Sequence, residues 1–318
     1  ESGLSEDFNR DGILDLAITL PLENKVSVFL GIGDGSLGPL ANYVVGEEPS
    51  MLFFADVNGD GNKDLITSNI ESNDASLLMS NGDGTFQQSL RIFTRGEVYS
   101  LTIGDFDDDG LDDLLALTSS DLFLITSNGD GTFRTPAEAV SDEVGVVVAH
   151  DFNQDGYLDF AGTYVDRSVD PEEHRIAIYD GIGDNTFGER RSYAAFSQTM
   201  SLQVSDLNND GKADLVATNR VEESLFDLYA LTLLGNGDGT FQNAVLGATN
   251  TGSTVILADF DDDGWIDLAS PLRGAVSIHR GNGDGRFRLP IHFTSVCDPK
   301  DLVAADFDGN GRPDLAIF

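Results

Sequence analysis

The sequence is short of the residues that carry most redox and catalytic chemistry. Among 318 residues there is one cysteine, Cys297, and there are four histidines. A single cysteine excludes an internal disulfide, and because its one nearby basic residue is Lys300, we expect Cys297 to be a small buried hydrophobe. The sequence contains no H-E-x-x-H, G-x-S-x-G or phosphate-binding P-loop motif. We therefore predict a protein that is not an enzyme, with structural roles for His150, His174, His279 and His292.

Long apolar runs and basic residues are also scarce. No uninterrupted apolar run reaches the roughly 18 residues of a membrane-spanning helix, so no membrane span is expected. The 55 acidic residues outnumber the 18 basic ones and give a formal net charge of −37. Such a surface repels nucleic acid and anionic membranes, which need a positive face. The N-terminal segment ESGLSEDFN lacks a signal-peptide core, as expected if a signal has been removed or the chain is an excised fragment.

Many of the acidic residues lie in one motif that occurs seven times. Its copies recur with a period near 50 residues, which indicates a repeat architecture. We call residues 7–15, 56–64, 105–113, 151–159, 206–214, 259–267 and 306–314 the acidic loops. Their sequences, each with the following residue, are DFNRDGILDL, DVNGDGNKDL, DFDDDGLDDL, DFNQDGYLDF, DLNNDGKADL, DFDDDGWIDL and DFDGNGRPDL.

The acidic loops have the spacing of a calcium-binding loop. Positions 1, 3, 5 and 9 carry side-chain oxygens and position 6 is glycine, much as in the first half of an EF-hand loop, where the backbone carbonyl at position 7 also binds Ca²⁺. Hard oxygen ligands without His or Cys favour Ca²⁺ over zinc or copper, and Mg²⁺ fits less well because it requires a strict octahedron. The predicted metal ligands are Asp7, Asn9, Asp11, Ile13 and Asp15; Asp56, Asn58, Asp60, Asn62 and Asp64; Asp105, Asp107, Asp109, Leu111 and Asp113; Asp151, Asn153, Asp155, Tyr157 and Asp159; Asp206, Asn208, Asp210, Lys212 and Asp214; Asp259, Asp261, Asp263, Trp265 and Asp267; and Asp306, Asp308, Asn310, Arg312 and Asp314.

Electrostatic repulsion within a loop also favours a bound ion. Two like charges about 4 Å apart cost roughly 1 kcal/mol in water and about 4 kcal/mol at an effective dielectric constant near 20. The third loop crowds four ligand carboxylates together, so it would be repulsive without a cation. We predict up to seven Ca²⁺ ions, one per repeat; the alternative is a set of plain Asx turns without metal. The seventh loop is the weakest match, because Asn310 replaces aspartate at position 5.

A second motif occurs in the first six repeats. We call residues 32–37, 81–86, 128–133, 182–187, 236–241 and 282–287 the glycine turns; their type sequence is NGDGTF. Clustered Gly, Asn and Asp between two apolar runs are typical of a hairpin turn, and we prefer turn chemistry to metal binding for Asp34, Asp83, Asp130, Asp184, Asp238 and Asp284. The aromatic residue that follows is expected to wedge between neighbouring blades in five turns: Phe86, Phe133, Phe187, Phe241 and Phe287.

The repeats predict an all-β protein. Each unit of about 50 residues holds four strand-like runs, which is the signature of a β-propeller blade, and no helical pattern of ordinary length appears. We predict a single domain over residues 1–318: a seven-bladed β-propeller of four-stranded antiparallel blades. The last blade is incomplete in this chain, because repeat 7 stops at PDLAIF.

These motifs resemble the FG-GAP/VCBS repeat family, the calcium-binding β-propellers that include the head of the integrin α-subunit. The resemblance covers essentially the whole chain and implies Ca²⁺ in the loop between the first and second strands of each blade. All seven repeats carry that loop here, whereas integrin-type propellers carry it in some blades, and the "FG…GAP" signatures are missing. The chain is more similar to secreted bacterial repeat proteins and to a fungal seven-bladed lectin, so integrin ligand specificity is not expected.

The function that we expect is non-catalytic binding or adhesion, with a glycan or a protein as partner. The longest connections on the face opposite the acidic loops, at 163–175, 218–230 and 68–76, are the expected ligand surface. Tyr157 and Trp265 are free to stack on sugars or, as we prefer, to pack on a neighbouring turn. The alternatives are an architectural subunit of an extracellular or cell-surface assembly and the propeller domain of a carbohydrate-active enzyme. Calcium loops of millimolar affinity predict an extracellular, cell-surface or periplasmic location.

Overall fold

The computed structural model describes residues 2–118, 121–140, 144–195, 197–220, 228–295 and 298–318. Strands dominate these residues, and the helical element among them is the short 3-10 helix η1 (Pro21–Glu23). No helix within the described ranges has the length and apolar character to cross a membrane. Cys297 and part of the connection at 218–230 lie outside the described residues.

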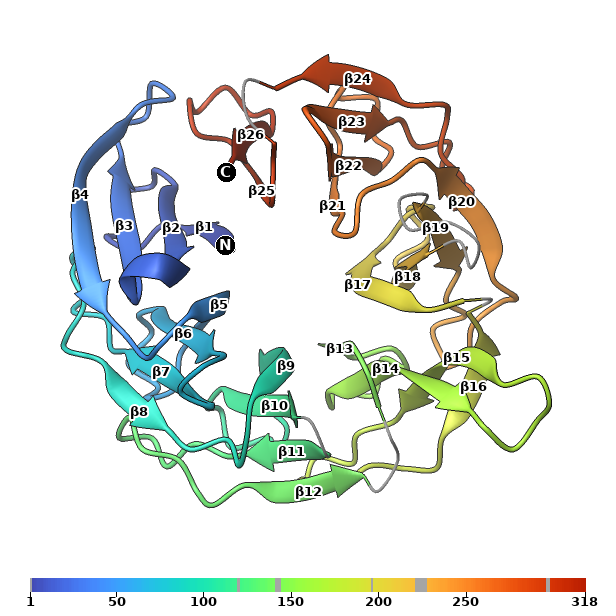
Figure 1. The fold of residues 1–318 in the computed structure, drawn as a ribbon, viewed down its shortest axis with the longest axis horizontal. Coiled ribbons are helices and arrows are strands. Elements are labelled where there is room, and N and C mark those ends of the chain that lie inside the picture. Colours follow the sequence, from blue (N-terminus) through green and yellow to red (C-terminus); the bar gives the residue numbers. More distant parts are fainter. Residues whose placement is uncertain (1, 119–120, 141–143, 196, 221–227, 296–297) are drawn as a thin grey trace. The chain divides into compact units, whose positions relative to one another are not determined.

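The strands pair with their sequence neighbours into six four-stranded antiparallel sheets and one two-stranded sheet (Figure 1). Each sheet takes its strands in chain order, which is the simplest meander and needs only short connections. The sheets are β1 (Gly3–Glu6), β2 (Asp15–Leu20), β3 (Lys25–Gly31) and β4 (Leu37–Val44); β5 (Pro49–Ala55), β6 (Asp64–Asn69), β7 (Asp74–Leu78) and β8 (Leu90–Ile92); β9 (Val98–Gly104), β10 (Asp113–Thr118), β11 (Leu122–Ile125) and β12 (Ala137–Val140); β13 (Val147–His150), β14 (Asp159–Asp166), β15 (Glu173–Tyr179) and β16 (Arg191–Ala194); β17 (Thr199–Ser205), β18 (Asp214–Arg220), β19 (Leu228–Leu233) and β20 (Val245–Thr249); β21 (Ile256–Ala258), β22 (Asp267–Leu272), β23 (Ala275–His279) and β24 (Ile291–Thr294); and β25 (Leu302–Ala305) with β26 (Asp314–Ile317).

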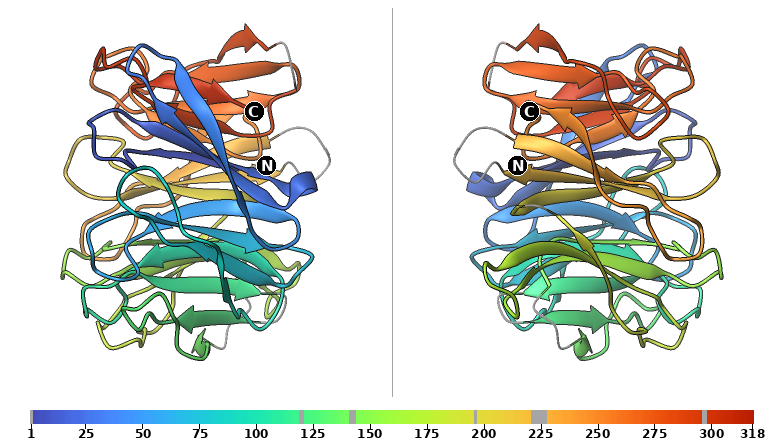
Figure 2. Two further views of the ribbon diagram at one scale, coloured as in Figure 1. Left: turned by 90° about the vertical axis from the view of Figure 1, so that its left-hand side faces the viewer. Right: turned by 90° about the vertical axis from the view of Figure 1, so that its right-hand side faces the viewer.

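The chain forms two compact units. One comprises residues 1–142 and 303–316, and the other comprises residues 143–302 and 317–318. Within the first unit the β1–β4 sheet lies beside β5–β8, which lies beside β9–β12, as the side views in Figure 2 also show. Within the second unit the sheets of β13–β16, β17–β20 and β21–β24 follow one another in the same way.

Burial along a sheet explains the apolar pattern of the sequence. The second strands are covered on both faces: every residue of β6 and of β10 is buried. β10, DLLALT, is mostly apolar, as expected of a strand buried on both faces, whereas β6, DLITSN, also buries polar side chains. The fourth strands are sheet edges and are largely exposed, as in β4 and β24. Several apolar side chains on these edges are exposed, among them Val44 and Phe293.

The aromatic residue of the glycine turn packs between neighbouring sheets, as predicted. Phe86, in the glycine turn of the second repeat, contacts Phe8, at position 2 of the acidic loop of the first repeat. The two rings meet edge to face with their centroids 5.4 Å apart. Phe241 and Phe152 repeat this contact in the second unit at 5.4 Å. All four rings are almost completely buried. A pair of aromatic rings thus joins the first repeat to the second and the fourth repeat to the fifth.

The fold is an all-β β-propeller, as the sequence predicts. The described residues give six four-stranded blades and one two-stranded sheet, β25–β26, at the seventh repeat. The acidic loops connect the first and second strands in every sheet, so the repeat places the seven candidate sites at equivalent positions.

Candidate metal centres in the acidic loops

The acidic loops turn sharply because the residues at positions 4 and 6 adopt the left-handed backbone conformation. Position 4 has positive φ in all seven loops, with Arg10 at 60° and Asn209 at 57°. Position 6, always glycine, has φ between 78° and 95°, as at Gly211 and Gly156. A Cβ on Gly156 would meet nothing within 4 Å, so glycine is needed there for its backbone conformation rather than for space.

The carboxylate at position 1 organises the rest of its loop. Asp7 accepts the backbone N–H groups of Asp11 and Gly12 at 3.1 and 2.8 Å. The same bond to the position 6 N–H recurs in the other six loops, at 2.7–2.9 Å. The position 5 side chain in turn accepts the N–H of position 7, as Asp155 does from Tyr157 at 2.9 Å. These bonds turn the loop around a centre on which positions 1, 3, 5 and 9 converge.

The aspartate at position 9 is the first residue of the second strand and is held from two sides. Asp159 accepts the N–H of Phe152, at position 2 of its own loop, at 2.9 Å and the N–H of Gly181, beyond the third strand, at 2.8 Å. Asp214 repeats this with Leu207 and Gly235 at 2.9 and 2.7 Å. Its carboxylate therefore ties the loop, the second strand and the end of the third strand together.

Burial makes the position 9 carboxyl groups hard to ionise. Desolvation raises the pKa of Asp113 from 3.8 to about 7, with a further contribution from the charges of Asp107 and Asp109 and partial relief from the N–H groups of Ser127 and Phe106. Burial likewise raises the pKa of Asp64, Asp159 and Asp214 to about 6, and it raises the pKa of Asp15 and Asp267. A divalent cation is the partner that would favour the charged form at such a site.

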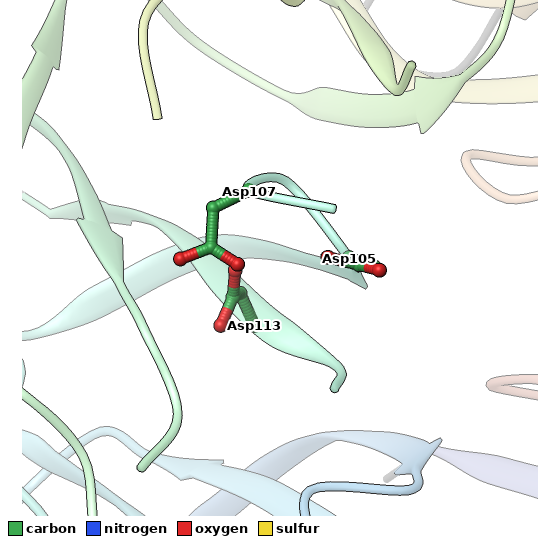
Figure 3. A group of neighbouring side chains, drawn as sticks. All are labelled: Asp105, Asp107 and Asp113. Atoms are coloured by element: carbon green, nitrogen blue, oxygen red, sulfur yellow. The ribbon is translucent and has the colours of Figure 1, made fainter. Parts of the chain in front are cut away.

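Three acidic loops gather carboxylate oxygens tightly enough to hold a metal ion. In each, one oxygen from each of three aspartates lies within 4.8 Å of the others; the groups are Asp105, Asp107 and Asp113; Asp259, Asp261 and Asp263; and Asp306, Asp308 and Asp314. Figure 3 shows the first group, with the carboxyl groups of Asp107 and Asp113 turned towards one another beside Asp105. These are the three loops with aspartate at position 3.

The other four loops carry asparagine at position 3. Asn9 accepts the N–H of Asp11 at 3.0 Å through Oδ1 and donates from Nδ2 to its carboxylate at 2.9 Å. Asn58 and Asn153 do the same with Asp60 and Asp155. The amide removes one charge from the cluster and keeps an oxygen at the ligand position, so both loop types retain the donor set of a hard cation.

Two buried carboxylate oxygens in these loops indicate whether the predicted ligands fit a metal ion. Oδ1 of Asp56, at position 1, and Oδ1 of Asp261, at position 3, are shielded from solvent and accept no hydrogen bond within the described residues. A buried carboxylate oxygen is costly when it has no partner. Because both atoms belong to predicted ligands, the residues present fit a bound cation.

The side chains at position 7 pack against the glycine turn of the same blade. A Cβ on Gly183 would lie 2.3 Å from Cδ1 of Tyr157, and one on Gly283 would lie 2.5 Å from Cε3 of Trp265. Only glycine therefore fits beneath these two rings. Of the two roles considered for Tyr157 and Trp265, packing on a neighbouring turn is the one that the structure shows.

The glycine turns satisfy their aspartates locally. Asp83 accepts both the N–H of Thr85 at 3.0 Å and its hydroxyl at 2.5 Å, and Asp130 does the same with Thr132. The hydroxyl bonds lower the pKa of Asp83 and Asp130, as they do for Asp34 and Asp238. These local bonds are those of an aspartate-initiated turn, as predicted for this motif.

Arginines beside two position 3 carboxylates were not anticipated from the sequence. Nη1 of Arg280 lies 3.0 Å from Oδ2 of Asp261, and Nη1 of Arg134 lies 3.9 Å from Oδ2 of Asp107. Both arginines follow the third strand or the glycine turn of their own blade. Only the paired strand register brings them to the acidic loop, so no local pattern marks them.

Two clefts also escaped sequence reasoning. Each lies where the fourth strand of one blade faces the glycine turn of the next. The larger, about 540 Å³, is lined by Leu90, Arg91, Phe93, Thr132, Phe133 and Arg134, among others. The second, about 260 Å³, is lined by Leu246, His279, Arg286, Phe287, Arg288 and Leu289, among others.

Where the described residues show no such cleft between two of the neighbouring blades, a tyrosine in the fourth strand contacts the next glycine turn. Tyr43 in β4 and Tyr193 in β16 accept the N–H of the phenylalanine in the next turn, at 3.1 and 3.0 Å. By strand register, Ile92 in β8 and Ala248 in β20 occupy the same position. The turn that follows then reads FRTP or FRLP instead of FQQS or FQNA, which is the signal that could have located the clefts.

The first connection predicted to bind a ligand is largely an extension of two strands. Much of 163–175 is strand, because β14 runs to Asp166 and β15 begins at Glu173. Arg175 bridges the two strand ends, with its Nε 3.4 Å from Asp166 and its Nη2 2.5 Å from Glu173. Residues 221–227 of the second connection lie outside the described residues. A ligand on this face stays a prediction.

Two of the histidines, His279 and His150, make contacts with a backbone carbonyl and an aromatic ring. His279 is buried, and its Nδ1 lies 3.3 Å from the carbonyl oxygen of Arg288. Burial lowers its pKa and that of His150. His150 stacks obliquely on Phe152 with ring centroids 5.6 Å apart. The environment of His279 is that of a buried structural residue, whereas His150 is exposed.

The chain belongs to the FG-GAP-like repeat family. The family model matches residues 7–67, 56–116, 105–162, 151–217 and 259–317, which together make up well over half of the chain. Each matched segment begins at an acidic loop. This identifies the repeat predicted from the sequence as the family's structural unit.

Solved structures share the fold at low sequence identity. A lectin from Agrocybe aegerita, described as specifically recognising non-reducing terminal N-acetylglucosamine, matches with a TM-score of 0.67 and 17% identity, over 100% of this chain and 88% of that chain. BBS1N, solved in complex with ARL6DN, matches with a TM-score of 0.61 and 9% identity, over 99% and 87%. The Vibrio cholerae biofilm matrix protein Bap1 matches with a TM-score of 0.48 and 13% identity, over 99% and 73%. No curated protein sequence gave a match.

Proposed function

We propose that this chain is a calcium-loaded, non-catalytic β-propeller that binds a glycan or a protein partner outside the cell. Up to seven Ca²⁺ ions occupy the acidic loops, one per repeat. The two-stranded sheet β25–β26 counts as the seventh blade in this proposal. The calcium holds the loops closed and the blades in register, and the binding surface is carried by that scaffold.

The observation that carries the calcium proposal is the convergence of ionisable oxygens in a buried position. Asp113 has a pKa raised to about 7 by burial, yet Asp105 and Asp107 place oxygens within 4.8 Å of its own. A protein without a cation would gain stability by replacing such a group with a neutral one. Ca²⁺ suits the set better than Mg²⁺, because the loop mixes carboxylate, amide and backbone oxygens in a flexible turn.

The affinity expected of such sites supports an extracellular, cell-surface or periplasmic location. Extracellular calcium modules bind with dissociation constants of about 10⁻⁴ to 10⁻³ M. Loops of that affinity fill outside the cell and stay empty in the cytosol. The crowded carboxylates would then cost stability in the compartment without calcium.

A glycan is the partner that we favour, and the larger cleft is a candidate place for it. Phe93 is 67% exposed and the Arg91 guanidinium lies 4.8 Å from the centre of its ring, so an aromatic face stands beside polar donors. Sugars use this combination of a stacking face and hydrogen-bond donors. The likeness to a lectin fold supports the same class of ligand.

An architectural subunit of an extracellular or cell-surface assembly is the alternative. The likeness to BBS1N, a β-propeller solved in complex with a protein, supports this second candidate. The propeller domain of a carbohydrate-active enzyme is less favoured, because the carboxylates at regular loop positions are already accounted for as metal ligands.

The test is a glycan array read with Ca²⁺ and with a chelator, on the wild type and on Phe93→Ala. The proposal expects glycan binding that needs Ca²⁺ and weakens at least tenfold in F93A. Tyr99→Ala is the matched control, since Tyr99 is an exposed aromatic outside the cleft. Binding lost equally in both variants would remove the cleft from the proposal, and an array without any binding would favour the architectural alternative.

A further inference from the structure

Three of the acidic loops reach across to the next loop through the side chain at position 4. Nδ2 of Asn209 donates to the carbonyl oxygen of Gly264 at 2.7 Å, and Nε2 of Gln154 donates to that of Gly211 at 2.9 Å. Arg10 donates in the same way to Gly61. In every case the acceptor is the glycine at position 6 of the following loop.

The donors are held in a backbone conformation that ordinary residues avoid. Arg10, Gln154 and Asn209 have φ of 60°, 60° and 57°. Two other loops place glycine at this position, at Gly59 and Gly309, where φ is 69° and 72°. A glycine would adopt this conformation without strain, so the side chains that are present contribute something that offsets its cost.

The accepted carbonyl belongs to the peptide just before Trp265, whose own carbonyl is a predicted ligand of the sixth loop. The N–H of Gly264 donates to Asp259 at 2.8 Å, and the N–H of Trp265 donates to Asp263 at 3.0 Å. The carbonyl of Gly264, between these two N–H groups, takes the bond from Asn209. That bond fixes the plane of the peptide leading to position 7, whose own carbonyl is a predicted calcium ligand.

We propose that Asn209 is a positioning residue for the calcium site of the sixth loop and couples the occupancy of the fifth loop to that of the sixth. The inference rests on the proposed function, because it takes Ca²⁺ as the bound ion. Calcium in the fifth loop orders residues 206–214, and Asn209 among them. An ordered Asn209 costs less to align with Gly264, so the sixth loop binds more tightly when the fifth is filled.

Trp265 makes the sixth loop selectively observable. It is the single tryptophan of the chain and occupies position 7 of that loop. Tb³⁺ replaces Ca²⁺ at oxygen sites, and its luminescence is sensitised by a neighbouring indole. Exciting the tryptophan therefore reports Tb³⁺ in the sixth loop, and displacement by Ca²⁺ gives the calcium affinity of that loop without any assay of partner binding.

The decisive variant is Asn209→Gly, which removes the donor and leaves the left-handed backbone unstrained. A net hydrogen bond of about 0.5–1.5 kcal/mol corresponds to a two- to tenfold weaker calcium affinity at the sixth loop. Asn209→Gln should restore the affinity, because Gln154 makes the same bond from the same position. Asn243→Gly, the same change at an exposed asparagine of the same blade, should leave the affinity unchanged.

Coupling is tested with Asp206→Ala, which removes the position 1 ligand of the fifth loop. This change should weaken the sixth loop several-fold in the wild type and have no further effect in the N209G background. Circular dichroism of each variant checks that the fold is kept. Wild type without Ca²⁺-displaceable Tb³⁺ emission would refute the calcium proposal itself. Displaceable emission with equal midpoints in wild type and N209G would refute the role of Asn209 alone.

Discussion

Each complete repeat contains two short turns built from the same residues, and their electrostatics differ. The acidic loop and the glycine turn both combine Asp, Asn and Gly, and both use residues with positive φ. In the third blade, Asp130 of the glycine turn is exposed and has a lowered pKa, because Thr132 donates to it from its hydroxyl and its N–H. Asp113 of the acidic loop is buried and has a pKa raised to about 7.

The difference lies in the number of carboxylates that share one turn. A single aspartate beside a threonine finds all its donors within two residues, as Asp83 and Asp238 do. A loop with three or four aspartates exhausts its backbone N–H groups, and oxygen atoms such as Oδ1 of Asp261 stay without a donor. The lone aspartate forms a turn, whereas the crowded loop is the one that we propose binds a cation.

The largest effect on stability is expected from removing calcium, which should weaken the acidic loops and leave the glycine turns unchanged. At millimolar Ca²⁺ and dissociation constants of about 10⁻⁴ to 10⁻³ M, each filled loop adds about 0.4–1.4 kcal/mol. Summed over several loops, excess chelator should lower the melting temperature by roughly 5–15 °C. Differential scanning calorimetry with and without Ca²⁺ measures this, and Mg²⁺ at equal concentration is the control. A melting temperature that is unchanged by the chelator would count against structural calcium.

Alanine in place of one aspartate of each motif in the third blade sharpens the comparison. Asp113→Ala loses the acceptor for the N–H of Ser127 and one calcium ligand, so it should cost about 3 kcal/mol in Ca²⁺. Asp130→Ala loses the bonds from Thr132 on the surface, where water can replace them, so it should cost much less than Asp113→Ala.

Chemical denaturation with and without Ca²⁺ gives both free energies, and calcium titration gives the stoichiometry. The cost of D113A should shrink in chelator, and its stoichiometry should fall by one. D130A should show the same cost in both conditions. If D113A binds as many ions as wild type, the third loop is not a calcium site.

The repeat, its strands and its turns could be predicted because each rests on local sequence. The acidic loops with glycine at position 6 appear between the first and second strands as predicted, and the wedge between Phe8 and Phe86 follows from two fixed positions in the repeat. Even the two-stranded end at β25–β26 follows from counting strands.

Contacts between repeats could not be predicted from one repeat alone. Asn209 and Gly264 are 55 positions apart, and nothing in either loop marks their hydrogen bond. The cleft beside Ile92 arises because β8 lacks the tyrosine that fills the same place in β4. Both depend on how two neighbouring blades differ, and the pattern that all repeats share does not contain those differences.

The pH dependence of stability should have opposite signs for the two motifs. In chelator, the raised pKa of Asp64, Asp159 and Asp214 means that the folded protein holds protons that the unfolded chain releases. Their contribution to stability is present below pH 3.8 and is lost as the pH rises through about 6, so apo stability should fall over that range. The lowered pKa of Asp83 and Asp130 contributes stability above pH 3.8 that disappears in stronger acid.

Denaturant unfolding between pH 4 and pH 8 checks the sign. Excess Ca²⁺ should reverse the trend for the acidic loops, because the ion binds their deprotonated form and calcium affinity therefore rises with pH. Apo stability that increases steadily across this range would show that the buried carboxylates are ionised without a cation.

The smallest effect on the free energy of unfolding is expected from Asp107→Asn, and this variant gives the most direct comparison of the two motifs. Four loops already carry asparagine at position 3, and in the first of them Asn9 both accepts from and donates to Asp11. In chelator the change removes one of the crowded charges and should stabilise the protein by up to about 1 kcal/mol. In Ca²⁺ the amide oxygen still binds, but with less charge, so calcium should stabilise the variant less than it stabilises the wild type.

The effect of D107N on stability should therefore differ between chelator and Ca²⁺, and that difference is what distinguishes a metal loop from a turn. Asp130→Asn makes the same change of charge in the glycine turn, where the amide oxygen can still accept the N–H of Thr132. Its effect should be small and equal in both conditions, since no ion is bound there. Paired denaturation curves of the two variants measure both differences. A calcium-dependent effect in D130N would place calcium in the glycine turn, and an effect of D107N that does not depend on calcium would mean that the charge at position 3 is balanced by Arg134 rather than by an ion.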